Sequence, residues 1–185
     1  HNRPIIPPPA PPQSGEYQYQ SGFPFSNFFD GYDIFQNQQV ENINQCSIIG
    51  TNKKTPLLNA VLINSTAGHG FESDDIHRES ILHPNSIIVP VSINVAEKIG
   101  NINGKKFLTS VVAGYEVATR IGSAAGTELL LRGFHPQGTH GTIAAAVTAG
   151  KLMDFSTDQM VHAIGIAGSL GAGLMAAQEG AMVKR

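Results

Sequence analysis

Apolar residues recur at three- and four-residue steps through most of the chain after residue 50, which is the spacing of amphipathic helices. The pattern predicts helices at about 56–67, 86–99, 105–122, 139–153 and 156–167. Thr55 and Pro56 are typical of a helix start, and Ser156 and Gln159 have the spacing of a capping box. We therefore expect an all-α fold, a helical bundle.

Residues 1–45 show neither a helical nor a strand period. Prolines crowd residues 4–12, and polar residues separate the phenylalanines that follow, so little apolar surface is available to offset the entropy cost of ordering. We predict an irregular N-terminal arm over residues 1–45, followed by a helical domain over residues 46–185. A short β-prone run and a turn, beginning at Cys46, open the second part.

Alanine, glycine and threonine dominate residues 138–150 and 163–177. Such small side chains let helix backbones approach closely, so we expect these segments at the centre of the bundle. The glycine-rich run 168–173 is neither a dinucleotide-binding motif nor a nucleophile elbow, because its glycine spacing is wrong and no strand precedes it. It indicates helix packing or a break between helices.

The charge composition narrows the class of partner. The formal net charge is −2, only 14% of residues are charged, and no cluster of lysines and arginines occurs, so we expect neither nucleic acid nor a membrane as partner. The apolar stretch 161–177 is too short to span a bilayer. A single cysteine, Cys46, and an N-terminal segment without a secretory signal are compatible with a cytoplasmic location.

Residues 72–84 are rich in chemically active side chains. Carboxylates at Glu72, Asp74 and Asp75 lie next to His77 and His83, and an anion beside an imidazole favours acid–base chemistry. From spacing alone, a solvated loop with a helix N-cap is the more frequent outcome. A metal site of Asp74, Asp75 and His77 is a weaker alternative, because the histidines lack the spacing of a known metal motif.

Two other segments carry candidate groups. Residues 133–141 place His135 and His140 at a turn before a helix, where exposed amides attract carboxylates. An ordinary cap by Thr139, with His140 packed in the first turn, is equally consistent with the spacing. Lys184, near the end of the chain, is by itself a solvated charge.

Four ordered blocks of sequence, within residues 62–97, 111–122, 133–153 and 162–185, together resemble the MmgE/PrpD family, which includes 2-methylcitrate dehydratase and cis-aconitate decarboxylase. The similarity covers about residues 46–185. It implies an incomplete helical domain of the N-terminal MmgE/PrpD type, normally covered by a smaller α/β domain, and chemistry that uses neither metal nor organic cofactor. It implies a homodimer and a small di- or tricarboxylate substrate.

The resemblance also assigns residues. His83 and His135 match active-site histidines, Lys184 matches a lysine of the substrate pocket, and Asp74 and Asp75 match paired acidic residues. Glu72 stands where many members carry Asp, and Ile76 stands where decarboxylase-like members carry Thr. We therefore predict four catalytic residues (His83, His135, Asp74 and Asp75) and four substrate-binding residues (Lys184, Glu72, His77 and His140).

The leading hypothesis is a fragment of a cofactor-independent lyase, either a hydro-lyase or a decarboxylase, that is inactive as this chain alone because the covering domain is missing. His83 and His135 should then converge on one substrate. The alternative is a catalytically idle helical module that acts through protein–protein association, which sizing by light scattering would test.

Overall fold

The computed structural model describes residues 46–70 and 74–176. The predicted arm at residues 1–45, Glu72 and Lys184 lie outside these residues. Within them the chain forms a two-stranded antiparallel hairpin and five helices. The hairpin pairs β1 (Cys46–Ser47) with β2 (Lys54–Thr55), and the helices are α2 (Leu57–His69), α3 (Asn85–Ile99), α4 (Gly104–Leu131), α5 (Pro136–Leu152) and α6 (Thr157–Ser169).

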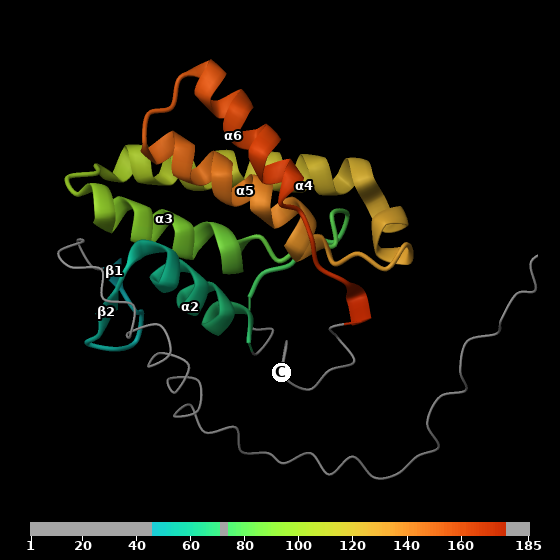
Figure 1. Cartoon of the computed structure of the whole chain (residues 1–185), viewed down its shortest axis with the longest axis horizontal. Helices are drawn as coiled ribbons and strands as arrows, with labels where there is room; N and C mark the ends of the chain where they lie inside the picture. Colours follow the sequence, from blue (N-terminus) through green and yellow to red (C-terminus); the bar gives the residue numbers. More distant parts are fainter. Residues whose placement is uncertain (1–45, 71–73, 177–185) are drawn as a thin grey trace, which may run out of the picture. The chain divides into compact units, whose positions relative to one another are not determined.

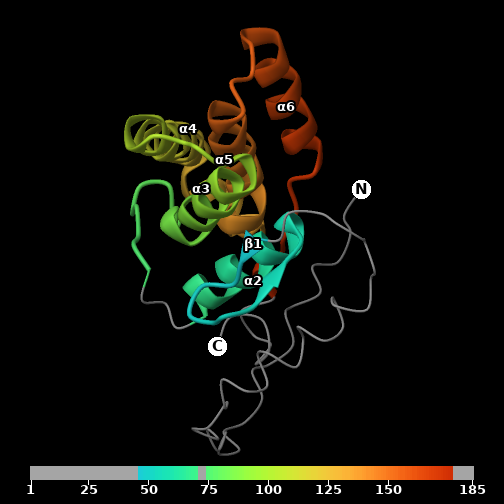
Figure 2. The ribbon, with the colours of Figure 1, turned by 90° about the vertical axis from the view of Figure 1, so that its left-hand side faces the viewer.

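Helix α5 is central to the bundle. It packs against α3, α4 and α6, while α2 packs on the other side of α3 beside the hairpin. Figure 1 shows this order from α6 through α5 and α3 to α2, and in Figure 2 α4 is seen nearly end-on, close to α3 and α5. The expected all-α bundle is therefore confirmed, with the alanine- and threonine-rich α5 in the interior. The other segment expected at the centre, residues 163–177, is largely exposed where it is described, and only Ala167 is buried there.

Two apolar clusters hold the helices together. One joins Leu82, Ile88, Ala118 and Ala144, which come from the loop before α3 and from α3, α4 and α5. The other lies between α2, α3 and α5 and centres on a set of three fully or almost fully buried residues, Val91, Val95 and Leu152. Burial of this apolar area is the main stabilising contribution expected for a bundle of this kind.

The helix starts are only partly as predicted. The capping box of Ser156 and Gln159 is present at the start of α6. Thr55 does not cap α2, because it is fully buried in β2 and Pro56 takes the cap position without a side-chain hydrogen bond. Helix α5 begins at Pro136 rather than near residue 139, since proline fits the first turn of a helix, where its missing N–H is not needed.

Three helices, α2, α4 and α6, end later than predicted. Helix α4 continues to Leu131 across a kink at Gly126, whose φ of 56° is outside the helical region. Helix α2 runs through Gly68 to His69 and has Gly70 as its C-cap residue, so Gly68 does not end it. Glycine only weakens a helix interior by roughly 1 kcal/mol relative to alanine, and packing against α3 outweighs that cost.

The segment after α6 returns to the turn before α5. The amide of His135 donates to Gly173 O at 3.0 Å, Ala172 N donates to Gly138 O at 2.9 Å, and Met175 N donates to Gly133 O at 2.8 Å. The glycine-rich run 168–173 thus breaks the helix and then pairs with the loop that contains His135. No helix in the described part of the chain is long and apolar enough to cross a membrane.

Candidate active site

Asp74 lies between two histidines. Its Oδ2 is 2.7 Å from Nδ1 of His69 and its Oδ1 is 3.2 Å from Nδ1 of His83. The Asp74 side chain is only 1% exposed, and the two imidazoles are 16% and 18% exposed. One buried carboxylate is therefore flanked by imidazoles on both of its oxygens, each of which still reaches solvent.

His69 enters this cluster because α2 is longer than its sequence pattern indicated. It is the last residue of the helix, and Asp74 follows five residues later. The apolar pattern predicted a helix that ends before His69, and it indicated no role for that residue. Its position in the last helical turn, just ahead of the acidic loop, was the available signal, because a helix C-terminus commonly carries a histidine.

His83 is held through its backbone. Its N–H donates to Oε1 of Gln137 at 2.8 Å, and its carbonyl accepts from Nε2 of Gln137 at 3.1 Å. The same Nε2 donates to Oγ of Ser86 at 2.9 Å. Gln137 lies in the first turn of α5, two residues after His135, so this amide fixes the His83 turn to the turn that carries His135. The role of Gln137 could not be predicted, because a side chain that binds backbone far away along the chain produces no pattern in the neighbouring sequence.

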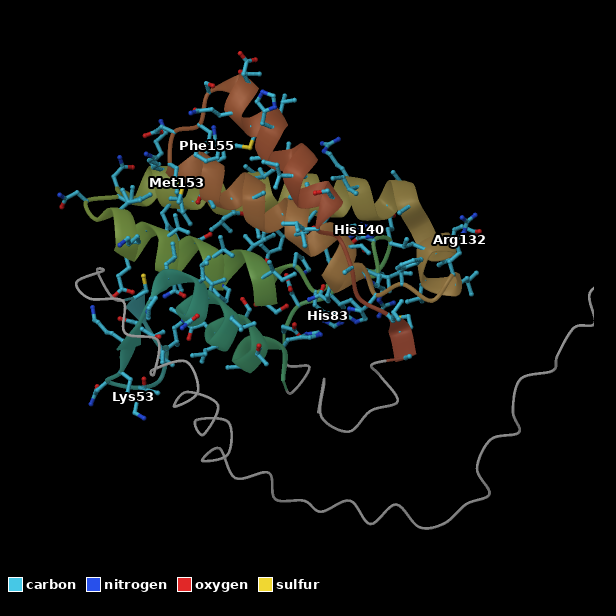
Figure 3. All side chains as sticks on the ribbon, in the orientation of Figure 1. Lys53, His83, Arg132, His140, Met153 and Phe155 are labelled. Atoms are coloured by element: carbon cyan, nitrogen blue, oxygen red, sulfur yellow. The ribbon has the colours of Figure 1, made fainter. Side chains whose placement is uncertain are left out.

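The two predicted catalytic histidines lie beside the same third histidine. The ring centroids of His69 and His83 are 5.0 Å apart, and those of His69 and His135 are 6.4 Å apart. His135 is the N-cap residue of α5 and does not use its side chain as the cap. His83 and His135 thus each lie beside His69, and Figure 3 shows His83 at the turn that enters α3.

Asp75 does not share the environment of Asp74. Its Oδ1 accepts from the N–H of Asn85 at 2.9 Å, and its Oδ2 accepts from the hydroxyl of Tyr115 at 2.8 Å. These bonds join the acidic loop to the start of α3 and to α4. Because successive side chains point to opposite sides of an extended segment, the pair Asp74 and Asp75 divides between two surfaces. Asp74 lies beside His69 and His83, where it could orient a catalytic histidine. The hydrogen bonds of Asp75 go to Asn85 and Tyr115 instead, so the same role is not supported for Asp75.

His77 also has other neighbours. Its Nδ1 lies 2.9 Å from Oγ of Ser80, within the turn closed by the bridge between His77 and Leu82. It lines a surface depression of about 460 Å³ together with residues of α4, none of which belongs to the histidine cluster. The structure thus places His77 at a different surface from Asp74, and its predicted role in substrate binding at the cluster gains no support.

His140 is almost completely buried in α5. Burial lowers the pKa of its imidazole, because the charged form loses hydration, so the neutral form prevails at neutral pH. This environment matches the packed position that the sequence allowed for His140. A neutral imidazole donates a hydrogen bond but supplies no charge to a carboxylate, so His140 differs from a cationic substrate anchor.

The cluster of His69, Asp74, His83 and His135 combines imidazoles, the side chains most often used as general acids and bases, with one buried anion. An imidazole paired with a carboxylate has a fixed tautomer and orientation, which general acid–base catalysis requires. His69, Asp74 and His83 also offer one donor atom each, all within 4.8 Å of one another, so these three side chains are the described group with the reach to hold a metal ion. The metal site predicted as a weaker alternative from the sequence, made of Asp74, Asp75 and His77, does not form, because Asp75 and His77 have other neighbours.

Comparison with known proteins gives two consistent findings. The family description "MmgE/PrpD N-terminal domain" matches residues 31–185, a range that begins inside the predicted arm. The cis-aconitate decarboxylase-like protein oryM of Aspergillus oryzae is 37% identical over 147 residues. The cis-aconitate decarboxylase of Aspergillus terreus is 38% identical over 145 residues. Each match covers 76% of this chain but only 30% of the relative, so the chain spans about a third of the length of these enzymes.

Proposed function

Because the chain belongs to the MmgE/PrpD family, a family of lyases, we propose that it forms part of a lyase that acts on a tricarboxylate-like substrate by histidine acid–base chemistry. The proposed enzyme requires neither a metal nor an organic cofactor. The observation that carries the proposal is the buried Asp74 carboxylate between His69 and His83, with the ring of His135 beside that of His69. These groups supply a base, an acid and an orienting anion in one place.

Loss of water from such a substrate requires a base that removes a proton from carbon and an acid that protonates the departing hydroxyl. We propose His83 and His135 for these two roles. Asp74 orients His83 and stabilises its imidazolium form, as a carboxylate does for other catalytic histidines. Lys184, outside the described residues, is proposed as an anchor for a substrate carboxylate, since a cation there would hold the polyanion in place.

Loss of carbon dioxide needs the same groups in another order. The breaking carbon–carbon bond leaves its electron pair on the substrate carbon, and a protonated histidine then delivers a proton to that carbon. The relatives named above are a cis-aconitate decarboxylase and a protein like it, which supports this branch. At the position where decarboxylase-like members carry threonine, this chain has Ile76, whose side chain is 56% exposed and supplies no hydroxyl. We therefore keep both reactions within the proposal.

The test is turnover of 2-methylcitrate, citrate and cis-aconitate by the longest native protein that contains this sequence. We expect His83→Ala and His135→Ala each to lower kcat by about 100-fold or more, the usual contribution of a positioned acid or base. His162→Ala is the matched control, because His162 is an exposed histidine of α6. Full activity in both active-site variants would overturn the proposal.

A further inference from the structure

We infer that His69, Asp74 and His83 bind a divalent transition-metal ion of the Zn²⁺ type. The donor set is two imidazole nitrogens and one carboxylate oxygen, all within 4.8 Å of one another. Zn²⁺ is commonly bound by three such protein ligands and a fourth ligand from solvent or substrate. Mg²⁺ and Ca²⁺ prefer sites made entirely of oxygen ligands, so the imidazoles select against them.

A second observation points to the same three side chains. In residues 46–70 and 74–176, five buried side-chain polar atoms have no hydrogen-bond partner, and three of them are His69 Nε2, Asp74 Oδ1 and His83 Nδ1. Asp74 Oδ1 is 3.2 Å from His83 Nδ1, near enough for an ion pair, yet neither atom makes a hydrogen bond. Buried polar atoms without partners are rare in proteins, and a bound ion is one of the ordinary explanations.

The ligands are held by rigid elements. His69 is part of α2, and the backbone of His83 is fixed by Gln137 of α5. Two ligands at about 2.1 Å from Zn²⁺ in a tetrahedral arrangement lie about 3.4 Å apart. The two unpartnered atoms Asp74 Oδ1 and His83 Nδ1 are 3.2 Å apart, close to that separation.

The ion competes with protons for these atoms. An imidazole nitrogen that binds a metal carries no proton, so a proton on that nitrogen must leave before the ion binds. Binding should release protons, and affinity should fall as the pH is lowered.

The ion would also occupy groups that the proposed lyase reaction uses, and this consequence rests on the proposed function. An imidazole bound to Zn²⁺ accepts no proton, so the same ion would inhibit the acid–base reaction. The site is thus an inhibitory one, and it is compatible with catalysis that needs no metal.

The test uses the 185-residue chain after treatment with a chelator. ZnCl2 is titrated by calorimetry in buffers of different ionisation enthalpy, which measures affinity, stoichiometry and proton release together. CoCl2 is used in parallel, because the visible absorption of Co²⁺ reports its ligand geometry. We expect one ion per chain, with release of protons.

The variants identify the ligands. His69→Gln, Asp74→Asn and His83→Gln should each weaken Zn²⁺ binding by at least about 100-fold, more than the loss typical of residues that only support a ligand. Two controls, His162→Gln on α6 and His77→Gln beside Ser80, should leave the affinity unchanged. Circular dichroism checks that each variant is folded. Equal Zn²⁺ affinity in the wild-type chain and in the folded Asp74→Asn variant would overturn the inference.

A measurement on the unmodified chain covers the case in which a variant does not fold. Co²⁺ is paramagnetic, so it should shift the imidazole proton resonances of His69 and His83 in the NMR spectrum and leave those of His162 in place. Absence of shifts at His69 and His83 under saturating Co²⁺ would refute the site. If the ion binds there but does not inhibit an active full-length enzyme, the proposed function fails while the metal site stands.

Discussion

Gln137 binds the backbone of His83 at both its N–H and its carbonyl, across 54 positions of the sequence. A third bond from the same amide reaches Ser86. A typical hydrogen bond contributes about 0.5–1.5 kcal/mol net to stability. We therefore expect Gln137→Met, which keeps the length of the side chain and loses all three bonds, to lower the free energy of unfolding by about 2–3 kcal/mol in urea.

The Gln137→Glu variant separates the contribution of the hydrogen bond that Gln137 accepts from that of the two that it donates. The carboxylate still accepts from the N–H of His83 but cannot donate to the His83 carbonyl or to Ser86, so two of the three bonds are lost. Its stability should not exceed that of the wild-type chain. A change within about 0.5 kcal/mol for Gln137→Met would show that this amide does not hold the His83 turn.

Glycine is required at residue 138 and not at residue 165. A Cβ at Gly138 would overlap with the backbone carbonyl of Ala172, whereas a Cβ at Gly165 would meet nothing within 4 Å. We expect Gly138→Ala to destabilise the chain by more than about 1 kcal/mol, because backbone must shift. Gly165→Ala lies inside α6 and should stabilise it by up to about 1 kcal/mol. Thermal unfolding of the two variants gives the comparison, and equal midpoints would contradict it.

Glu97 ties the hairpin to α3. Burial alone would raise the pKa of its carboxyl, but hydrogen bonds from Ser47 N, from Lys54 and from the Ser47 hydroxyl together outweigh burial and lower the pKa to about 2. The native state therefore holds this group ionised at pH values where the unfolded chain binds a proton. The resulting stability is present above about pH 4.5 and is lost as the pH falls towards 2.

Glu97→Gln should remove this acid dependence. At neutral pH we expect it to lower the free energy of unfolding by up to about 3 kcal/mol, and the stability of the variant should fall less steeply than that of the wild-type chain between pH 4.5 and 2. Urea unfolding at several pH values measures both effects. Parallel pH profiles for the two proteins would argue against the assigned role of Glu97.

Tyr115 makes a contribution to stability that is lost at high pH, whereas that of Glu97 is lost at low pH. Burial raises the pKa of its hydroxyl, and the hydrogen bond to the Asp75 carboxylate raises it further. Its contribution to stability is complete below about pH 10, the ordinary pKa of tyrosine, and is lost as the pH rises above that value. Tyr115→Phe should destabilise the chain by about 1.5–3 kcal/mol at pH 7, the usual range for a hydrogen bond to a charged group. Unchanged stability in Tyr115→Phe would show that the bond is not formed.

The helices could be predicted because their signals are local. Apolar periodicity located all five, and Ser156 with Gln159 marked the start of α6 correctly. The errors came from tertiary contacts that no local pattern carries. Packing against α3 continues α2 through Gly68, and the close approach of Ala172, not a turn, explains Gly138.

The candidate site was predictable to a similar extent. Asp74, His83 and His135 stand in conspicuous motifs, and the structure brings them together around a residue, His69, that has no motif of its own. Asp75 and His77 were grouped with them only because they are neighbours in sequence. Which side of an extended segment faces the site depends on the packing of α3 and α4, and the sequence does not encode that locally.

The pairing of residues 172–175 with the turn at residues 133–138 sets an order of events during synthesis. The ribosome releases His135 and Gln137 first, and the chain that completes their surroundings follows almost forty residues later. At a synthesis rate of roughly 5–20 residues per second, Gly173 and Met175 are made about 2 to 8 seconds after the turn. Over that interval the turn lacks its bonds to Gly173 and Met175, and the hydrogen bonds between Gln137 and His83 are among the contacts that already hold it.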